Sequence, residues 1–153
     1  MSEQPIRLYL DVCSLQRMFD DQTQARIRLE AEAIKLILAS IENGEFEWLT
    51  SEVVDYEIAQ NPDEERALKA TLLIDQARTK VIVGTNETTR ASELERLGFT
   101  GFDALHLACA ESGNADVFLT TDDKLMKRAR RIATKLAVRV ANPLQWASEN
   151  ISV

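Results

Sequence analysis

The sequence is poor in the residues that usually build a zinc site or a disulfide framework. It has two cysteines and one histidine, and no CxxC pair, which argues against a structural zinc site. Any bound metal is expected to be a hard cation with oxygen ligands. Cys13 and Cys109 lie inside apolar segments, so we expect two buried free thiols rather than a disulfide.

Flexible linkers and long apolar stretches are also missing. Only 5 glycines and 3 prolines occur among 153 residues, so we expect a single domain over residues 1–153. No stretch reaches membrane-spanning length, and the N-terminus lacks the features of a signal peptide. These absences predict a cytoplasmic protein without membrane contact. The net charge of -7 argues against broad non-specific binding to nucleic acid, although it leaves room for a local basic surface.

Short apolar segments alternate with amphipathic ones along the chain. We expect strands at residues 6–12, 46–49, 80–83, 116–119 and 137–141. Helices are expected at residues 24–43, 64–79, 86–98, 103–111 and 122–136, with a further one, capped by Thr50 and Ser51, that holds Glu57. This alternation, without a hairpin signal, predicts an α/β fold, a three-layer α/β/α sandwich with a mainly parallel central sheet. Ligands of such sheets bind beyond the carboxyl ends of the strands.

Four carboxylates lie in or beside apolar elements, where an isolated charge is expensive. They are Asp11, Glu57, Asp103 and Asp122. On its helix, Glu57 shares the apolar face, whereas Asp55 points nearly opposite, towards water. Asp103 likewise shares a face with apolar residues of its helix.

Each of these acids also has a simpler explanation. Asp122 could be an ordinary N-cap, Asp103 could stabilise a helix start, and Glu57 could pair with an arginine. Asp11 follows an apolar strand and has no expected helix to cap, so it is the hardest to explain in this way. Taken together, the four acids favour a site for divalent cations.

The order of these acids resembles a known family. Asp11 follows a strand, Glu57 lies on a helix six residues after Ser51, and two segments follow, Asp-Ala-Leu-His-Leu-Ala from Asp103 and Leu-Thr-Thr-Asp-Asp-Lys-Leu from Leu119. This pattern, over essentially the whole chain, resembles the PIN domain family of RNA-cleaving domains, which includes the VapC-like toxins of toxin–antitoxin pairs. The chain departs from the pattern at Cys13, where many PIN domains carry a small polar residue; Ser14 comes one position later.

The resemblance implies a cofactor and roles for particular residues. Mg²⁺ or Mn²⁺ is expected, with all four acids as catalytic and metal-binding residues: Asp11 and Asp103 as direct ligands, Asp122 completing the site, and Glu57 orienting a water or binding a second ion. Supporting roles are expected for Thr120, Asp123, Ser14 and His106. Thr120 would hold Asp122 by a hydrogen bond, and Asp123 is a possible substitute for Asp122.

The segment that follows Asp122 is strongly basic. At helical spacing its cations share one face, which is either a solvated surface or a phosphate-binding one. We predict RNA binding by Lys124, Lys127, Arg128, Arg131 and Lys135.

These expectations together predict a metal-dependent endoribonuclease that hydrolyses RNA phosphodiester bonds, the toxin of a type II toxin–antitoxin pair. Its expected partners are the RNA substrate, an antitoxin protein and a second copy of the chain, packed through the helices of residues 52–74 around Tyr56. The alternatives are a catalytically silent PIN module used for binding, and a solitary nuclease without an antitoxin. A receiver-like phosphoryl-transfer domain would need a strand-end lysine beside a nucleophilic aspartate, and the sequence offers no such lysine.

Overall fold

The apolar segments form one parallel sheet within residues 4–152, the part of the chain that the computed structural model describes. Five strands lie in the order β3-β2-β1-β4-β5, and every neighbouring pair is parallel. Their bounds are β1 Ile6–Leu10, β2 Phe46–Ser51, β3 Thr79–Val81, β4 Val117–Leu119 and β5 Arg139–Ala141.

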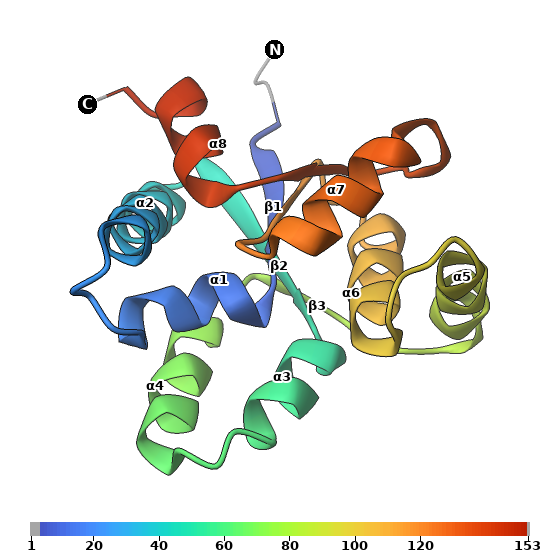
Figure 1. The fold of residues 1–153 in the computed structure, drawn as a ribbon, viewed down its shortest axis with the longest axis horizontal. Coiled ribbons are helices and arrows are strands. Elements are labelled where there is room, and N and C mark those ends of the chain that lie inside the picture. The colour runs from blue at the N-terminus through green and yellow to red at the C-terminus, as the bar shows by residue number, and fades with distance from the viewer. Residues whose placement is uncertain (1–3, 153) are drawn as a thin grey trace.

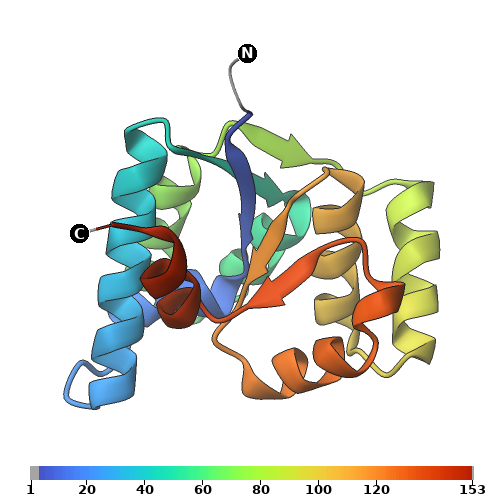
Figure 2. The ribbon, with the colours of Figure 1, turned by 90° about the horizontal axis from the view of Figure 1, so that it is seen from above.

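Helices cover both faces of this sheet. They are α1 Val12–Gln16, α2 Ala25–Glu42, α3 Glu52–Ala59, α4 Glu64–Ile74, α5 Thr85–Arg96, α6 Gly101–Ser112, α7 Asp123–Arg131 and α8 Pro143–Asn150, with short 3-10 turns η1 Arg17–Phe19 and η2 Ala133–Lys135. In Figure 2, α2 and α8 lie on one side of the strands and α6, backed by α5, lies on the other. This arrangement confirms the predicted three-layer α/β/α sandwich.

The longest helix shows how local sequence sets these elements. Along α2, Ala31, Ile34 and Ile37 recur at helical spacing and are buried, so one face of the helix packs into the core. The helix ends at Asn43-Gly44, where Gly44 adopts a φ of 82°. A residue without Cβ tolerates that left-handed conformation, which is the common way to end a helix.

Several element boundaries differ from the prediction. The strand predicted for residues 6–12 stops at Leu10, because Val12 already begins the short helix α1. The helix predicted for residues 64–79 ends at Ile74, and the basic helix ends at Arg131 rather than near residue 136. The C-terminal segment forms helix α8, which buries Trp146 against Phe46 with ring centroids 5.0 Å apart.

The strand order places the carboxyl ends of β1 and β4 next to each other in the interior of the sheet. From β1 the chain first adds β2 and β3 on one side and later adds β4 and β5 on the other. The carboxyl ends of β1 and β4 therefore lie at a topological switch point, where parallel α/β sheets form ligand crevices. Figure 1 shows α1, α3, α6 and α7 grouped around the end of β1. Among residues 4–152 we find no helix that is both long and apolar enough to cross a membrane.

Candidate metal centre and active site

Asp11 lies at the carboxyl end of the central strand β1. Its backbone amide donates to the Leu119 carbonyl of β4 at 3.2 Å, which ties the ends of the two strands together. The carboxylate is 4% exposed and accepts from the Ser14 amide at 2.9 Å, so Asp11 is the N-cap of α1. The expectation that Asp11 has no helix to cap is therefore wrong, because a helix of only five residues leaves no periodic pattern in the sequence.

Thr120 connects Asp11 with the acid that follows β4. Its hydroxyl oxygen accepts from the Asp122 amide at 3.1 Å, and the hydroxyl lies close enough to the Asp11 carboxylate to oppose the rise of its pKa. Ser14 supports the same strand end, since its hydroxyl donates to the Leu119 carbonyl at 3.0 Å. Both residues are fully buried. They hold the backbone that presents Asp11 and Asp122.

Asp122 caps a helix, as the simpler explanation of this residue anticipated. One carboxylate oxygen accepts from the amides of Lys124 at 2.9 Å and Leu125 at 3.2 Å, so Asp122 is the N-cap of α7. Capping uses Oδ1, and a carboxylate has a second oxygen that can bind a cation. Capping and metal binding are therefore compatible in this residue.

Glu57, on α3, is held by the single histidine. His106 Nε2 lies 3.3 Å from Glu57 Oε2, while His106 Nδ1 lies 2.6 Å from the Tyr9 hydroxyl. A carboxylate can only accept, so Nε2 carries the hydrogen, and Nδ1 of the neutral ring accepts from Tyr9. Burial raises the pKa of Tyr9 well above 10.0, which keeps that hydroxyl a donor. His106, 2% exposed, thus orients Glu57 from the core.

Ser51 completes this buried chain. Its hydroxyl lies 2.7 Å from the Tyr9 hydroxyl, whereas its side chain makes no capping hydrogen bond at the start of α3. Ser51 is the N-cap residue of α3, as predicted, but it does not cap the helix through its side chain. Ser51 instead belongs to the hydrogen-bonded chain that ends at Glu57.

Burial raises the pKa of two aspartates of the site, and for Asp103 neighbouring carboxylates add to the rise. Burial raises the pKa of Asp11 from 3.8 to about 6, although hydrogen bonds from Thr120 and Ser14 oppose the rise. Burial also raises the pKa of Asp103, in the first turn of α6, and the carboxylates of Asp122 and Glu57 raise it further. Mutual repulsion of this kind favours neutralisation by a proton or by a cation.

Cys13 lies near all four acids, as the pKa of its thiol indicates. Partial burial raises the pKa of its thiol, and the charges of all four carboxylates raise it further: Asp11, Glu57, Asp122 and Asp103. Cys13 and Cys109 are both free, and Cys109 is buried as predicted. Cys13 is exposed, so its predicted burial is wrong. It lines a cleft of about 700 Å³ together with Glu57, Phe102 and Asp122.

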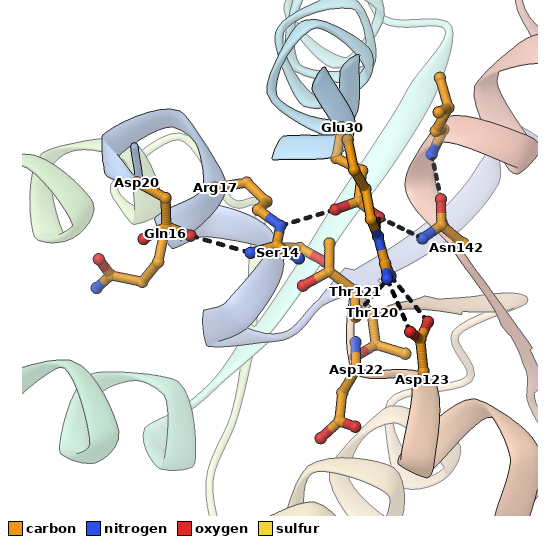
Figure 3. A network of polar contacts seen from close by, with 12 residues as sticks. Ser14, Gln16, Arg17, Asp20, Glu30, Thr120, Thr121, Asp122, Asp123 and Asn142 are labelled. Atoms are coloured by element: carbon orange, nitrogen blue, oxygen red, sulfur yellow. Dashed lines mark hydrogen bonds and ion pairs between the residues drawn. The ribbon is translucent and has the colours of Figure 1, made fainter. Parts of the chain in front are cut away.

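Asp123 is directed elsewhere. Its two carboxylate oxygens each lie 2.8 Å from the Arg26 guanidinium, and in Figure 3 its carboxylate points away from that of Asp122. Arg26 also contacts Glu30. The structure thus places Asp123 in an ion-pair network behind the cleft rather than beside the other acids.

Glu30 is the centre of that network, and no pattern in the sequence predicts this role. Its side chain is 1% exposed, and it accepts from Arg17 at 2.8 Å and from Asn142 at 2.7 Å (Figure 3). With Arg26 it therefore joins η1, α2, the start of α7 and the start of α8. The network fixes the segment that carries Asp122.

The predicted basic stripe is interrupted. Lys135 lies in η2, beyond the end of α7, so the five cations do not share one continuous helix. Within the described part of the chain, none of the five lines the cleft. Arg128 instead lies over the turn at Gly98, where an added Cβ would come 3.2 Å from its Nε.

The residues present fit a hard divalent cation by their chemistry, because carboxylate oxygens are the ligands that Mg²⁺ and Mn²⁺ prefer. In residues 4–152, however, no group of three or more acidic, histidine or cysteine side chains is arranged to hold an ion. Asp122 caps α7 through Oδ1 alone, and Glu57 is turned to His106. Binding therefore requires side-chain rotation at the cleft.

Comparison with known proteins assigns the chain to a family. The model of the PIN domain family matches residues 9–132, so the chain belongs to the PIN domain family. No curated protein matches the chain in sequence. Among solved structures it is similar to VapBC2 from Rickettsia felis bound to a DNA fragment from their promoter, with a TM-score of 0.56 and 14% identity over 90% of this chain and 98% of that one. VapBC-1 from nontypeable Haemophilus influenzae gives a TM-score of 0.54 and 15% identity over the same shares.

Proposed function

We propose that this protein is a metal-dependent endoribonuclease that hydrolyses RNA phosphodiester bonds. The observation that carries the proposal is that four carboxylates, from four different elements, lie near enough to Cys13 to raise the pKa of its thiol, beside the switch point of a parallel sheet. Membership of the PIN domain family, whose members are typically nucleases, supports it.

Each acid has a distinct part in this proposal. Asp11 and Asp103 would hold the cation directly, since burial raises the pKa of both carboxyl groups and a cation would offset that cost. Asp122 contributes its remaining oxygen while Oδ1 caps α7. Glu57, held through His106 Nε2, orients the attacking water and accepts its proton at a carboxylate oxygen. A bound Mg²⁺ or Mn²⁺ supplies Lewis acidity, which lowers the pKa of water and offsets charge on the phosphoryl oxygens.

The basic residues of α7 and η2 provide a surface for the RNA outside the cleft. Lys124, Lys127, Arg131 and Lys135 are exposed, and α7 begins directly after Asp122. Cations on the surface attract the RNA backbone irrespective of sequence. Reversing the charge of Arg131 should weaken RNA binding without unfolding the domain; unchanged affinity would remove α7 from the RNA path.

We further propose that the protein is the toxin of a toxin–antitoxin pair and that it forms a homodimer. The similarity to two VapBC structures supports a protein partner. Large apolar side chains are exposed on α3 and α4: Tyr56 at 58%, Leu68 at 59% and Leu72 at 59%. Apolar surface of this kind is typical of an interface. Sedimentation velocity should show twice the 17.2 kDa of one chain, and a monomer at all concentrations would contradict the dimer.

Cleavage of RNA tests the proposed activity. Wild-type protein with Mg²⁺ or Mn²⁺ should cut a mixed single-stranded RNA, and chelation of the metal should stop cleavage. Asp11→Asn and Asp103→Asn should each lower the rate at least a hundredfold, because each removes charge that holds the cation. Asp55→Asn is the matched control, since Asp55 lies on α3 near Glu57 but pairs with Lys80. Metal-independent cleavage, or full activity in both variants, would refute the mechanism. Absent cleavage by the wild type would favour a catalytically silent binding module.

A further inference from the structure

The cleft lined by Glu57 and Asp122 also has two arginines in its walls. Besides Cys13, Glu57 and Asp122, its walls include Arg17 and Arg66. Arg17 begins η1 and Arg66 lies in the first turn of α4. No pattern in the sequence links these two arginines to the four acids.

One carboxylate joins the two arginines. Asp20 Oδ1 lies 2.6 Å from Arg66 and its Oδ2 lies 3.2 Å from Arg17. The side chains are partly exposed, at 20% for Arg17, 26% for Asp20 and 30% for Arg66. Asp20 therefore occupies the position between two guanidinium groups that a phosphate dianion or diester could also take.

Arg66 is only partly satisfied by its present contacts. Its terminal nitrogen donates to Asp20 and, at 3.3 Å, to the Gln16 carbonyl. Its Nε is buried without a hydrogen-bond partner, and so is Oε1 of neighbouring Gln16, which also lines the cleft. A buried, unpaired N–H of a charged group is unfavourable. Rotation of Arg66 towards an anionic ligand would give its Nε a partner. It would break only the contacts with Asp20 and the Gln16 carbonyl.

RNA can bind in this cleft only if cationic side chains there offset the repulsion from the acids. The carboxylates of Glu57 and Asp122 line the cleft and repel an approaching polyanion. Within the described residues, the cations of α7 do not reach the cleft. Arg17 and Arg66 are the arginines that its walls contain. Arg17 is also bound to Glu30, so Arg66 is the freer of the two.

We propose that Arg66, assisted by Arg17, binds a backbone phosphate of the RNA beside the one that is cleaved, and that this phosphate displaces Asp20. The inference rests on the proposed ribonuclease function. It assigns the RNA strand to the side of the cleft that carries Arg17 and Arg66. Asp20 then acts as an internal competitor that weakens RNA binding. Removing its charge should therefore strengthen binding, the opposite of what a purely structural ion pair predicts.

Binding is measured by fluorescence anisotropy with a labelled, mixed-sequence single-stranded oligoribonucleotide, in EDTA so that cleavage does not interfere. Arg66→Ala should raise Kd about five- to twentyfold and make the slope of log affinity against log salt shallower by about 0.7, the value for one lost contact to a single strand. Arg66→Lys should recover part of the affinity. Asp20→Asn should lower Kd about threefold or more.

The matched controls lie away from the cleft. Arg78→Ala removes an arginine that is 80% exposed beside Glu47, and Asp75→Asn removes an exposed acid at the end of α4; both should leave Kd within twofold. Unchanged Kd in Arg66→Ala and Asp20→Asn would overturn the inference, even if Arg66→Ala lowers the melting temperature. If these shifts occur but the wild type does not cleave RNA with Mn²⁺, the binding site stands and the proposed activity fails.

Discussion

At the scale of single residues, the site combines ordinary structural roles with functional ones. Asp11 and Asp122 are N-caps of α1 and α7, and they also lie at the two strand ends that form the switch point. A cap needs one carboxylate oxygen, and a metal can use the other. The simpler explanation and the functional one are therefore separable only by experiment.

Asp122 offers that separation, because asparagine caps helices about as well as aspartate. Asp122→Asn should keep both amide contacts and leave the free energy of unfolding within about 0.5 kcal/mol, while RNA cleavage falls strongly. Asp122→Ala should lose cleavage and also about 1 kcal/mol of stability. The measurement is urea denaturation beside a cleavage assay. Cleavage by Asp122→Asn at the wild-type rate would reduce this residue to a cap.

The raised pKa of Asp11 predicts an unusual dependence of stability on pH. Its pKa rises from 3.8 in the unfolded chain to about 6 in the fold, so the folded state prefers the protonated acid. Without metal, ionised Asp11 destabilises the fold by up to about 3 kcal/mol above pH 6, and this penalty vanishes below pH 4. In EDTA, Asp11→Asn should therefore be more stable than wild type at pH 7.5 and equally stable near pH 4. Urea denaturation measures both proteins. A stability difference between Asp11→Asn and wild type that does not change with pH would contradict the raised pKa.

At the scale of elements, helix phase predicted the direction of side chains reliably, whereas short helices could not be predicted. The phase of α3 correctly separated Glu57, which lines the cleft, from Asp55, which pairs with Lys80. The five-residue helix α1 escaped prediction, and with it the capping role of Asp11. The basic segment was predicted as one helix, yet it breaks after Arg131. Periodicity needs more than one or two turns to be visible.

Contacts between distant elements were invisible in the sequence. Glu30 and Asn142 are 112 residues apart, and Asp20 and Arg66 are 46 apart. Neither pair follows a motif or a helical spacing. The four acids could be selected because their own elements fix their direction, whereas Glu30 and Arg66 acquire their roles only from the tertiary fold.

Glu30 gives a test of the network that positions α7. Glu30→Ala removes a buried acceptor shared by Arg17, Arg26 and Asn142, and it should lower the free energy of unfolding by about 2–4 kcal/mol. The control Glu32→Ala removes a 61% exposed partner of Lys35 on the same helix and should cost less than about 0.5 kcal/mol. Thermal or urea unfolding measures both. Equal stability of the two variants would mean that the network contributes little.

At the scale of the whole molecule, the strand order explains why acids so far apart in sequence converge. The order β3-β2-β1-β4-β5 brings the ends of β1 and β4 together, while α3 and α6 add Glu57 and Asp103 from the sides. The sequence predicted the alternation of strands and helices and the parallel sheet. It did not fix the order of the strands, and so it did not show that the cleft extends from the acids to Arg66.

Calorimetric titration with Mn²⁺ measures whether these carboxylates form one site for a hard divalent cation. Wild-type protein and the control Asp55→Asn should show the same saturable binding. Asp11→Asn and Asp103→Asn should weaken it at least tenfold, because each loses a charged ligand. Absence of Mn²⁺ binding to the wild type at millimolar concentration, or undiminished binding in both variants, would contradict the account.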